Sequence, residues 1–180
     1  MDDFVKETAA ASHTSARVAN LIKLLRYKQW ADRLSFDSLA EVPEEEAWKQ
    51  RRTVFGNMVH TLNHIVVIDD IFRHHMNGTA HPYTKRNTDD TPPIAKVRQA
   101  SEEMDQWLLD EVQNWSDDDL DTVIKFKYVG GGEGAMTREE IIIHLVNHTT
   151  YHRGIFSDML LQVPYKMASN DLTVYLRDHA

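Results

Sequence analysis

Three histidines spaced four residues apart, His144, His148 and His152, stand within an apolar stretch near the C-terminal end of the chain. Residues four apart share one face of an α-helix, because each turn takes about 3.6 residues. The segment Thr137-Arg-Glu-Glu140 precedes the stretch and is typical of a capping box. The pattern therefore predicts a helix to about residue 163, with the three histidines in the middle of its core-facing stripe.

Burial of three imidazoles on one stripe needs an explanation, because a buried polar ring costs free energy unless it is hydrogen-bonded. A second predicted helix carries His60 and His64, again four residues apart on its inward side. One metal ion can bind several imidazole nitrogens at once, and histidine is the commonest metal ligand. The alternative is a metal-free core in which hydrogen bonds satisfy each ring. The four-residue spacing of the histidines on both predicted helices favours a metal site over a metal-free core.

Apolar residues at helical spacing predict three further long helices, over about residues 14–41, 53–76 and 91–115. The pair Asn77-Gly78 is a typical end for the second. Thr91 is expected to cap the third, with Pro92 at its first helical position. Residues 44–52 are expected to form a solvated connection, residues 1–13 a mobile tail, and residues 170–177 a short amphipathic segment across the helices.

A β-hairpin is expected between the third and fourth helices. Ile124, Phe126 and Tyr128 alternate with two lysines, which indicates a strand. A glycine-rich turn over residues 130–134 follows, and Ala135-Met136 is expected to return as the second strand. The acidic run at residues 117–119 is expected to be a solvated loop or a helix start. The predicted fold is an all-α four-helix bundle with a short β-hairpin, as one domain over residues 1–180.

The composition excludes several classes of function. The net charge of −8 disfavours nucleic acid, whose phosphates need clustered Lys and Arg. Cysteine is absent, so there is no disulfide, thiolate metal site or catalytic Cys. No secretory signal or membrane span is recognisable, and a cytoplasmic location is expected.

The chemistry expected of such a bundle follows from its ligand type. Bundle cores hold metal sites built from facing helices, so one helix offers His60 or His64 and the other offers two of its three histidines. Three protein ligands leave a position for water or substrate, which is typical of a catalytic site. Imidazoles suit Zn, Ni or Fe alike. Tyr151 and Arg153 are candidates for substrate contact, although Arg153 points about 140° from His148 on the helical wheel and a structural ion pair is its alternative.

Two motifs then resemble a known family. The segments His64-Ile-Val-Val-Ile-Asp69 and Asn147-His148-Thr-Thr-Tyr-His152-Arg-Gly154 look like those of the DinB/YfiT-like family. The resemblance runs from Tyr27-Lys-Gln-Trp-Ala31 to the closing Asp171-Leu-Thr-Val-Tyr-Leu-Arg177. It implies a four-helix bundle with a three-histidine metal site. By that resemblance the ligands are His64, His148 and His152, with His60 and His144 as neighbours that support them.

The resemblance also implies a function. Members include bacillithiol S-transferases and a mycothiol-dependent maleylpyruvate isomerase, in which a metal activates a low-molecular-weight thiol. The implied function is a metal-dependent enzyme that activates a thiol or water toward a small-molecule substrate. The alternative is a non-catalytic bundle that binds a metal or a ligand. Members are often homodimers, and Tyr27, Trp30 and Trp107 provide aromatic surface for a symmetric dimer.

Overall fold

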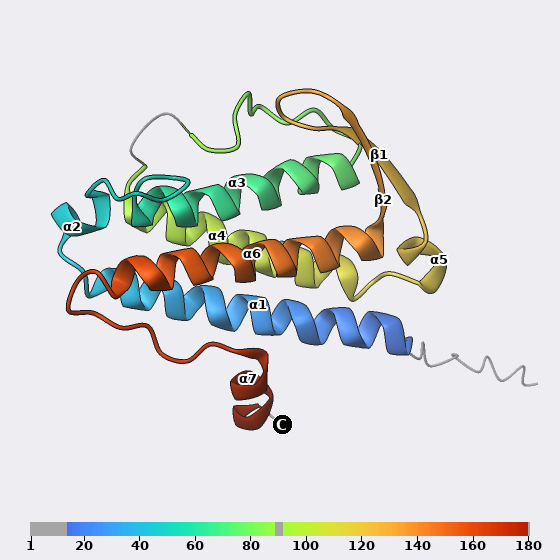
Figure 1. Ribbon diagram of the computed structural model, residues 1–180. Coiled ribbons are helices and arrows are strands. Elements are labelled where there is room, and N and C mark those ends of the chain that lie inside the picture. The colour runs from blue at the N-terminus through green and yellow to red at the C-terminus, as the bar shows by residue number, and fades with distance from the viewer. Residues whose placement is uncertain (1–13, 89–91, 180) are drawn as a thin grey trace, which may run out of the picture.

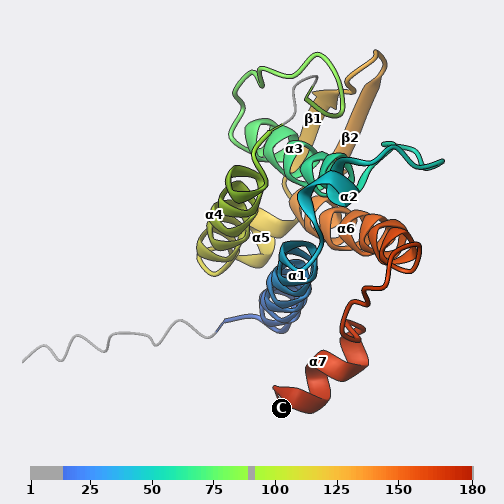
Figure 2. The same cartoon turned by 90° about the vertical axis from the view of Figure 1, so that its left-hand side faces the viewer.

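The computed structural model describes residues 14–88 and 92–179, so the predicted tail and Thr91 lie outside the described residues. The elements are α1 (Ala16–Ala40), α2 (Glu44–Trp48), α3 (Met58–Met76), α4 (Ile94–Val112), α5 (Asp117–Leu120), β1 (Val123–Lys127), β2 (Glu133–Thr137), α6 (Arg138–Leu160) and α7 (Leu172–Asp178). The four long helices form a bundle in which α1 and α3 each pack against both α4 and α6 (Figures 1 and 2). The predicted four-helix bundle with a short β-hairpin is confirmed.

Side-chain caps explain where the long helices begin. The predicted capping box is present on α6, where Thr137 and Glu140 satisfy each other's backbone N–H groups. The side chain of Asn57 accepts a hydrogen bond from the backbone N–H of His60, so α3 begins at Met58. The predicted start of this helix at residue 53 is therefore wrong. Residues 53–57 form a turn, and this turn brings Phe55 to the site described below.

Other predicted boundaries also differ from the structure, among them the end of the third long helix, which is Val112 and not residue 115. Residues 44–48 form the short helix α2 instead of a solvated connection, and its Ala47 is buried. Three glutamates in its first turn favour that helix electrostatically. Helix α4 begins at Ile94 with Pro93 at the N-cap, so Pro92 lies outside it. Helix α6 ends at Leu160, before the turn that leads to Pro164.

The hairpin covers one end of the bundle beside α3 and α6 (Figure 1). Its strands are antiparallel, and Phe126 pairs with Gly134 in the register. A Cβ atom at Gly134 would lie 2.6 Å from the ring of Phe126, so only glycine allows this ring to lie against its partner strand. The buried Phe126 ring packs 5.3 Å from that of Phe72 on α3. The acidic residues 117–119 are expected to form either a solvated loop or a helix start. They begin the short helix α5.

A buried network of charges ties the four long helices together. Lys28 on α1 lies 3.0 Å from Asp32, 2.8 Å from Asp69 on α3 and 2.6 Å from Asp105 on α4. Arg153 on α6 lies 3.3 Å from Asp32. All five side chains are at most 5% exposed. Loss of one partner from such a buried pair is strongly destabilising, because it leaves an unpaired charge in the core.

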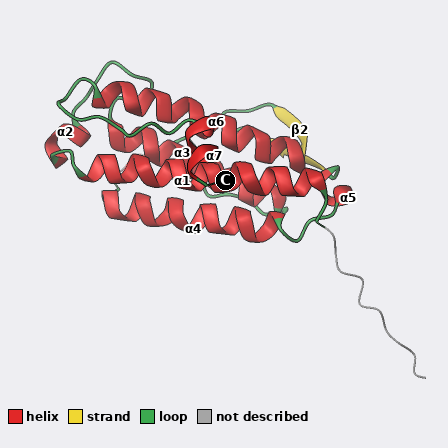
Figure 3. Cartoon of the chain, turned by 90° about the horizontal axis from the view of Figure 1, so that it is seen from below, coloured by secondary structure: helices red, strands yellow, loops and turns green. Residues whose placement is uncertain are grey.

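The C-terminal helix α7 lies over α1, as predicted for the amphipathic tail (Figure 3). Its Tyr175 is buried between Tyr27 and Trp30, with ring centroids 5.9 and 5.5 Å away. Tyr27 is 5% exposed and is therefore part of the core, not of a surface that a second subunit could cover. The homodimer stays a prediction. Within the described residues, no helix has the length and apolar character required to cross a membrane.

Candidate metal centre

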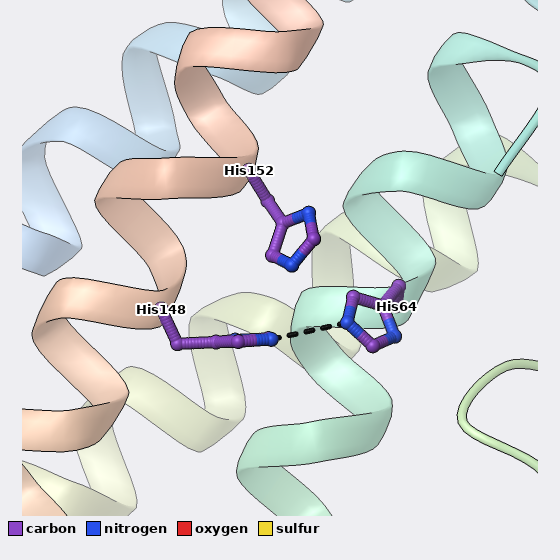
Figure 4. Close-up of side chains that lie close together, drawn as sticks. All are labelled: His64, His148 and His152. Carbon is purple, nitrogen blue, oxygen red and sulfur yellow. Dashed lines mark hydrogen bonds between the residues drawn. The ribbon is translucent and has the colours of Figure 1, made fainter. Parts of the chain in front are cut away.

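The three ligands that the resemblance implies, His64, His148 and His152, lie close together between α3 and α6. His64 projects from α3 toward His148 and His152 on α6 (Figure 4). One nitrogen from each ring lies within 4.8 Å of the others, and the Nε2 atoms of His64 and His148 are 3.0 Å apart. His64 and His148 are 84 residues apart in the chain, so it is the packing of α3 against α6 that brings them together. We call these three residues the triad.

Two contacts fix the ring of His64. Its Nδ1 hydrogen-bonds the backbone carbonyl of Arg86, in the loop between α3 and α4. A carbonyl only accepts, so Nδ1 carries the proton, and the neutral ring presents the lone pair of Nε2 to His148. The ring of Phe55 stacks on that of His64 at 4.0 Å between centroids and 29° between planes. The ring is thus held in the tautomer that a metal ligand needs.

Burial keeps the triad uncharged. Loss of hydration lowers the pKa of His64 and of His152 to about 4, and that of His148 to about 2. Mutual repulsion among the rings lowers the pKa of His148 further, because it lies next to both of the others. All three rings are therefore neutral at pH 7, which is the form that binds a metal.

The donor set of the triad fits a cation. The Nε2 atom of His64 presents a lone pair to the Nε2 atom of His148 at 3.0 Å, so without an ion His148 must donate a proton across that contact. A divalent ion between the rings would accept both lone pairs, because neutral imidazole is a good ligand for it. The proton of His148 would then lie on Nδ1, which is buried and lacks a hydrogen-bond partner within the described part of the chain.

One side of the triad opens into a cavity of about 650 Å³. The cavity lies between α3, α6, the hairpin and the turn at residues 53–57. Its interior is mainly apolar, and it is lined among others by Phe55, Ile68, Phe72, Phe126 and Met136. A small molecule in this cavity would lie directly beside the triad.

Of the two residues proposed for substrate contact, one lines the cavity and the other does not. Tyr151 lines the cavity and is 62% exposed. Arg153 is buried in the bundle, where it bonds Asp32 and donates to the Tyr27 hydroxyl at 2.9 Å. It is not among the described residues that line the cavity. The ion-pair alternative for Arg153 is what the structure shows.

The two supporting histidines also differ. The ring of His144 lies 5.6 Å from that of His148 and lines the cavity. The ring of His60 lies 5.4 Å from Trp48 and beside Asn57, and His60 is not among the described lining residues. Both His144 and His148 are half-buried and face the cavity, so these two histidines lie at the edge of the core stripe and not in its middle, whereas His152 is buried as predicted.

Sequence reasoning misses three contributors to the site. Arg86 acts through its backbone, which no pattern reveals, and Phe55 falls inside a segment expected to be helical. Phe126 has a recognisable signal, because it alternates with lysines and its partner strand carries Gly134. That signal predicts the hairpin but not which face of the bundle the hairpin covers.

Comparison with known proteins agrees with the geometry. The model of the DinB family matches residues 12–179. Protein DinB of Bacillus subtilis (strain 168) is 26% identical over 167 residues, which cover 86% of this chain and 92% of that protein. The crystal structure of a DinB-like protein from Bacillus cereus ATCC 10987 matches with a TM-score of 0.62 and 17% identity, over 81% of this chain and 94% of that one. That structure supports the fold, and the family model spans nearly all of the chain, so the chain belongs to the DinB family.

Proposed function

We propose that the triad holds a divalent metal ion, and that the protein is an enzyme that activates a thiol or a water molecule toward a small-molecule substrate. One observation carries the proposal. Three neutral imidazoles converge beside a cavity, so a bound ion would keep a coordination position open to that cavity. A structural site closes all positions with protein ligands, and this triad offers only three.

The ion supplies one kind of chemistry: it lowers the pKa of a bound water or thiol, so that the nucleophile is available at neutral pH. The protein contributes the arrangement around it. The Arg86 carbonyl and the Phe55 ring fix His64, and the apolar walls exclude water from the reacting groups. Tyr151 places an exposed phenol at the cavity, where it can donate a hydrogen bond to substrate.

A second candidate function has one observation in its favour. No aspartate or glutamate is found among the described residues that line the cavity. An enzyme that must move a proton usually has a carboxylate or a histidine for it, and here three histidines serve as ligands. A bundle that binds a metal and a ligand without turnover is therefore the alternative, and it leaves His144 as the residue to test for proton transfer.

The test begins with elemental analysis of the purified protein. Protein loaded with Zn, Ni or Fe is then assayed with low-molecular-weight thiols and 1-chloro-2,4-dinitrobenzene, and separately for hydrolysis of p-nitrophenyl acetate. Turnover should vanish with 1,10-phenanthroline, return with the metal, and be absent from His148→Ala. His74→Ala is the matched control, because His74 lies on α3 away from the triad and bonds Thr79. Turnover that survives complete metal removal contradicts the catalytic role, and stoichiometric metal without turnover favours the alternative.

A further inference from the structure

The charge around the cavity is opposite to that of the chain. The protein has 28 acidic and 20 basic residues, yet the described lining contains Arg86 and Lys127 and no carboxylate. Both cations are exposed, and neither has a carboxylate partner within ion-pair distance among the described residues. Several other cations at the surface are paired with carboxylates, among them Arg17, Lys49 and Arg98. Arg86 and Lys127 are therefore available to a ligand in the cavity.

Arg86 lies beside the triad. Its backbone carbonyl accepts a hydrogen bond from His64, and Arg86 and the three histidines line the same cavity. An anion beside Arg86 would therefore also lie near the metal centre. Guanidinium groups bind carboxylates and phosphates through two parallel hydrogen bonds, so this residue suits such a group.

The remainder of the cavity favours an apolar body. Aromatic and aliphatic side chains from α3, the hairpin and the turn form its walls. Three exposed apolar residues, Val54, Tyr128 and Tyr151, continue those walls outward, with exposures of 69%, 54% and 62%. They come from three separate segments of the chain, and exposed apolar side chains gathered at one opening are typical of a ligand-binding site. We call these three residues the rim.

From these observations we propose that the cavity binds an organic anion with an aliphatic or aromatic body. The anionic group lies at Arg86, with Lys127 near the opening, and the body lies along the apolar walls and the rim. A cavity of about 650 Å³ accommodates a molecule of this kind. The proposal names the substrate class of the triad site and rests on the proposed function for the chemistry that follows binding.

The physical reason for a local cation is the charge of the whole chain. A net charge of −8 repels anions at long range, so an anionic ligand binds only where positive charge dominates locally. The apolar walls then supply affinity in proportion to the area that they bury. Both parts are needed, and each can be tested separately by changing the ligand.

The experiment is calorimetric titration of the purified full-length protein with three ligands: octanoate, octanamide and butyrate. Octanoate should bind at least about tenfold more tightly than the neutral octanamide, because a charge-assisted hydrogen bond is lost in the amide. It should bind roughly a hundredfold more tightly than butyrate, because each buried methylene contributes about three- to fourfold. Metal content is measured on the same samples.

Two variants locate the anion. Arg86→Gln removes the charge but leaves the backbone carbonyl that holds His64, so it should weaken octanoate about tenfold and leave octanamide unchanged. Lys125→Gln is the control, because it also removes one positive charge, from the hairpin, at a residue that is not among the described residues lining the cavity. It should change neither affinity.

The outcomes separate this proposal from the proposed function. Equal binding of octanoate and octanamide, equal binding of octanoate and butyrate, or an equal loss in the two variants overturns the anion proposal. Preference for octanoate through Arg86 in protein that holds no metal supports the anion site, and it contradicts only the proposed metal chemistry.

Discussion

Arg153 lies 3.3 Å from Asp32 in the middle of the bundle, although its neighbour in sequence, His152, faces the cavity. Successive helical residues point about 100° apart, so one helix delivers adjacent side chains to two environments. Here α6 sends a metal-site histidine one way and a buried cation the other. The Arg153 guanidinium also donates to the Tyr27 hydroxyl and lies 5.3 Å from the centre of that ring. It is a structural residue of the bundle.

Arg153→Met should therefore destabilise the fold. The change leaves buried carboxylates with one cation in place of two, and loss of one partner from a buried pair costs about 3–5 kcal/mol. Urea unfolding at pH 7 measures it. Arg177→Met is the control, because Arg177 is 71% exposed and its one ion-pair partner among the described residues is its neighbour Asp178. Equal unfolding midpoints for the two variants would contradict a structural role for Arg153.

The buried network has more carboxylates than cations. Asp32, Asp69 and Asp105 face Lys28 and Arg153, so one negative charge is in excess. Burial raises the pKa of Asp69 to about 6 and that of Asp105 to about 7, against the attraction of Lys28. Because these groups share one cation, the network as a whole holds the extra proton.

The sign of the pH dependence follows from that proton. The folded state binds it more tightly than the unfolded chain does, so its stabilisation is complete at low pH and is lost as pH rises through about 6–7. Asp105→Asn replaces the titrating carboxyl group with a neutral amide, so this loss of stability with rising pH should disappear. The free energy of unfolding of the variant, minus that of the wild type, should rise by about 1–3 kcal/mol from pH 5 to 8. The difference cancels histidine titration common to both proteins, and a difference that stays constant with pH would refute the extra proton.

The triad predicts a specific pattern of metal loss. His64→Ala, His148→Ala and His152→Ala should each abolish stoichiometric metal, since each supplies one of three ligands. His144→Ala should only weaken binding, by about 10- to 100-fold, because its ring neighbours that of His148. Mass spectrometric metal analysis after dialysis distinguishes the groups, with His74→Ala as the control that retains the ion. Full metal in His148→Ala would remove the basis for the site.

Metal binding should persist to an unusually low pH. Protons compete with the ion only below the pKa of each ring, and burial lowers those pKa values to about 4 for His64 and His152 and about 2 for His148. Zinc affinity should therefore change little from pH 7 to 5. Histidines with the ordinary pKa of about 6.5 would already lose the ion over that range. Titration calorimetry with circular dichroism at each pH tests this, and a steep loss of zinc from folded protein above pH 5 would contradict it.

The lowered pKa values of the triad have the opposite effect on the metal-free protein, because they make its stability depend on pH. The unfolded histidines take up protons below about pH 6.5, while the folded triad does not. The metal-free fold therefore loses stability as pH falls below that value. Circular dichroism is needed beside the calorimetry for this reason.

We also predict a symmetric homodimer. Trp30 and Trp107 are half-buried and remain partly available to a second subunit, whereas Tyr27 is enclosed by α7. Sedimentation at micromolar concentration should show twice the 20.8 kDa of one chain. A single species at the mass of one chain would refute the prediction.

Periodicity predicts the long helices well, because each has an apolar face and a recognisable start or end. Thr137 with Glu140 is a local signal, and the structure contains that capping box. Asn57 is also a cap, but the charged and apolar residues before it resemble another helical turn, which places the predicted start too early. The short α2 is missed because exposed glutamates dominate a segment whose one buried residue is Ala47.

The buried network cannot be predicted from spacing. Lys28 and Asp32 are four apart and resemble an exposed helical pair. Their burial depends on Asp69 and Asp105, which come from two other helices. The metal site is likewise only partly predictable. Spacing finds the candidate histidines on both helices, and the resemblance selects His64, His148 and His152 from them. The contact of His64 with the Arg86 carbonyl depends on the path of a loop, which spacing does not predict.

That carbonyl has a consequence for how such proteins can diverge. Every residue has a backbone carbonyl, so substitution at position 86 changes the side chain at the cavity without removing the hydrogen bond that orients His64. His64 therefore constrains only the backbone path of the loop that carries Arg86. The side chain at position 86 can vary with the molecule that the cavity binds. A single substitution at position 86 can in this way change the group that faces the cavity while the three histidines keep their arrangement.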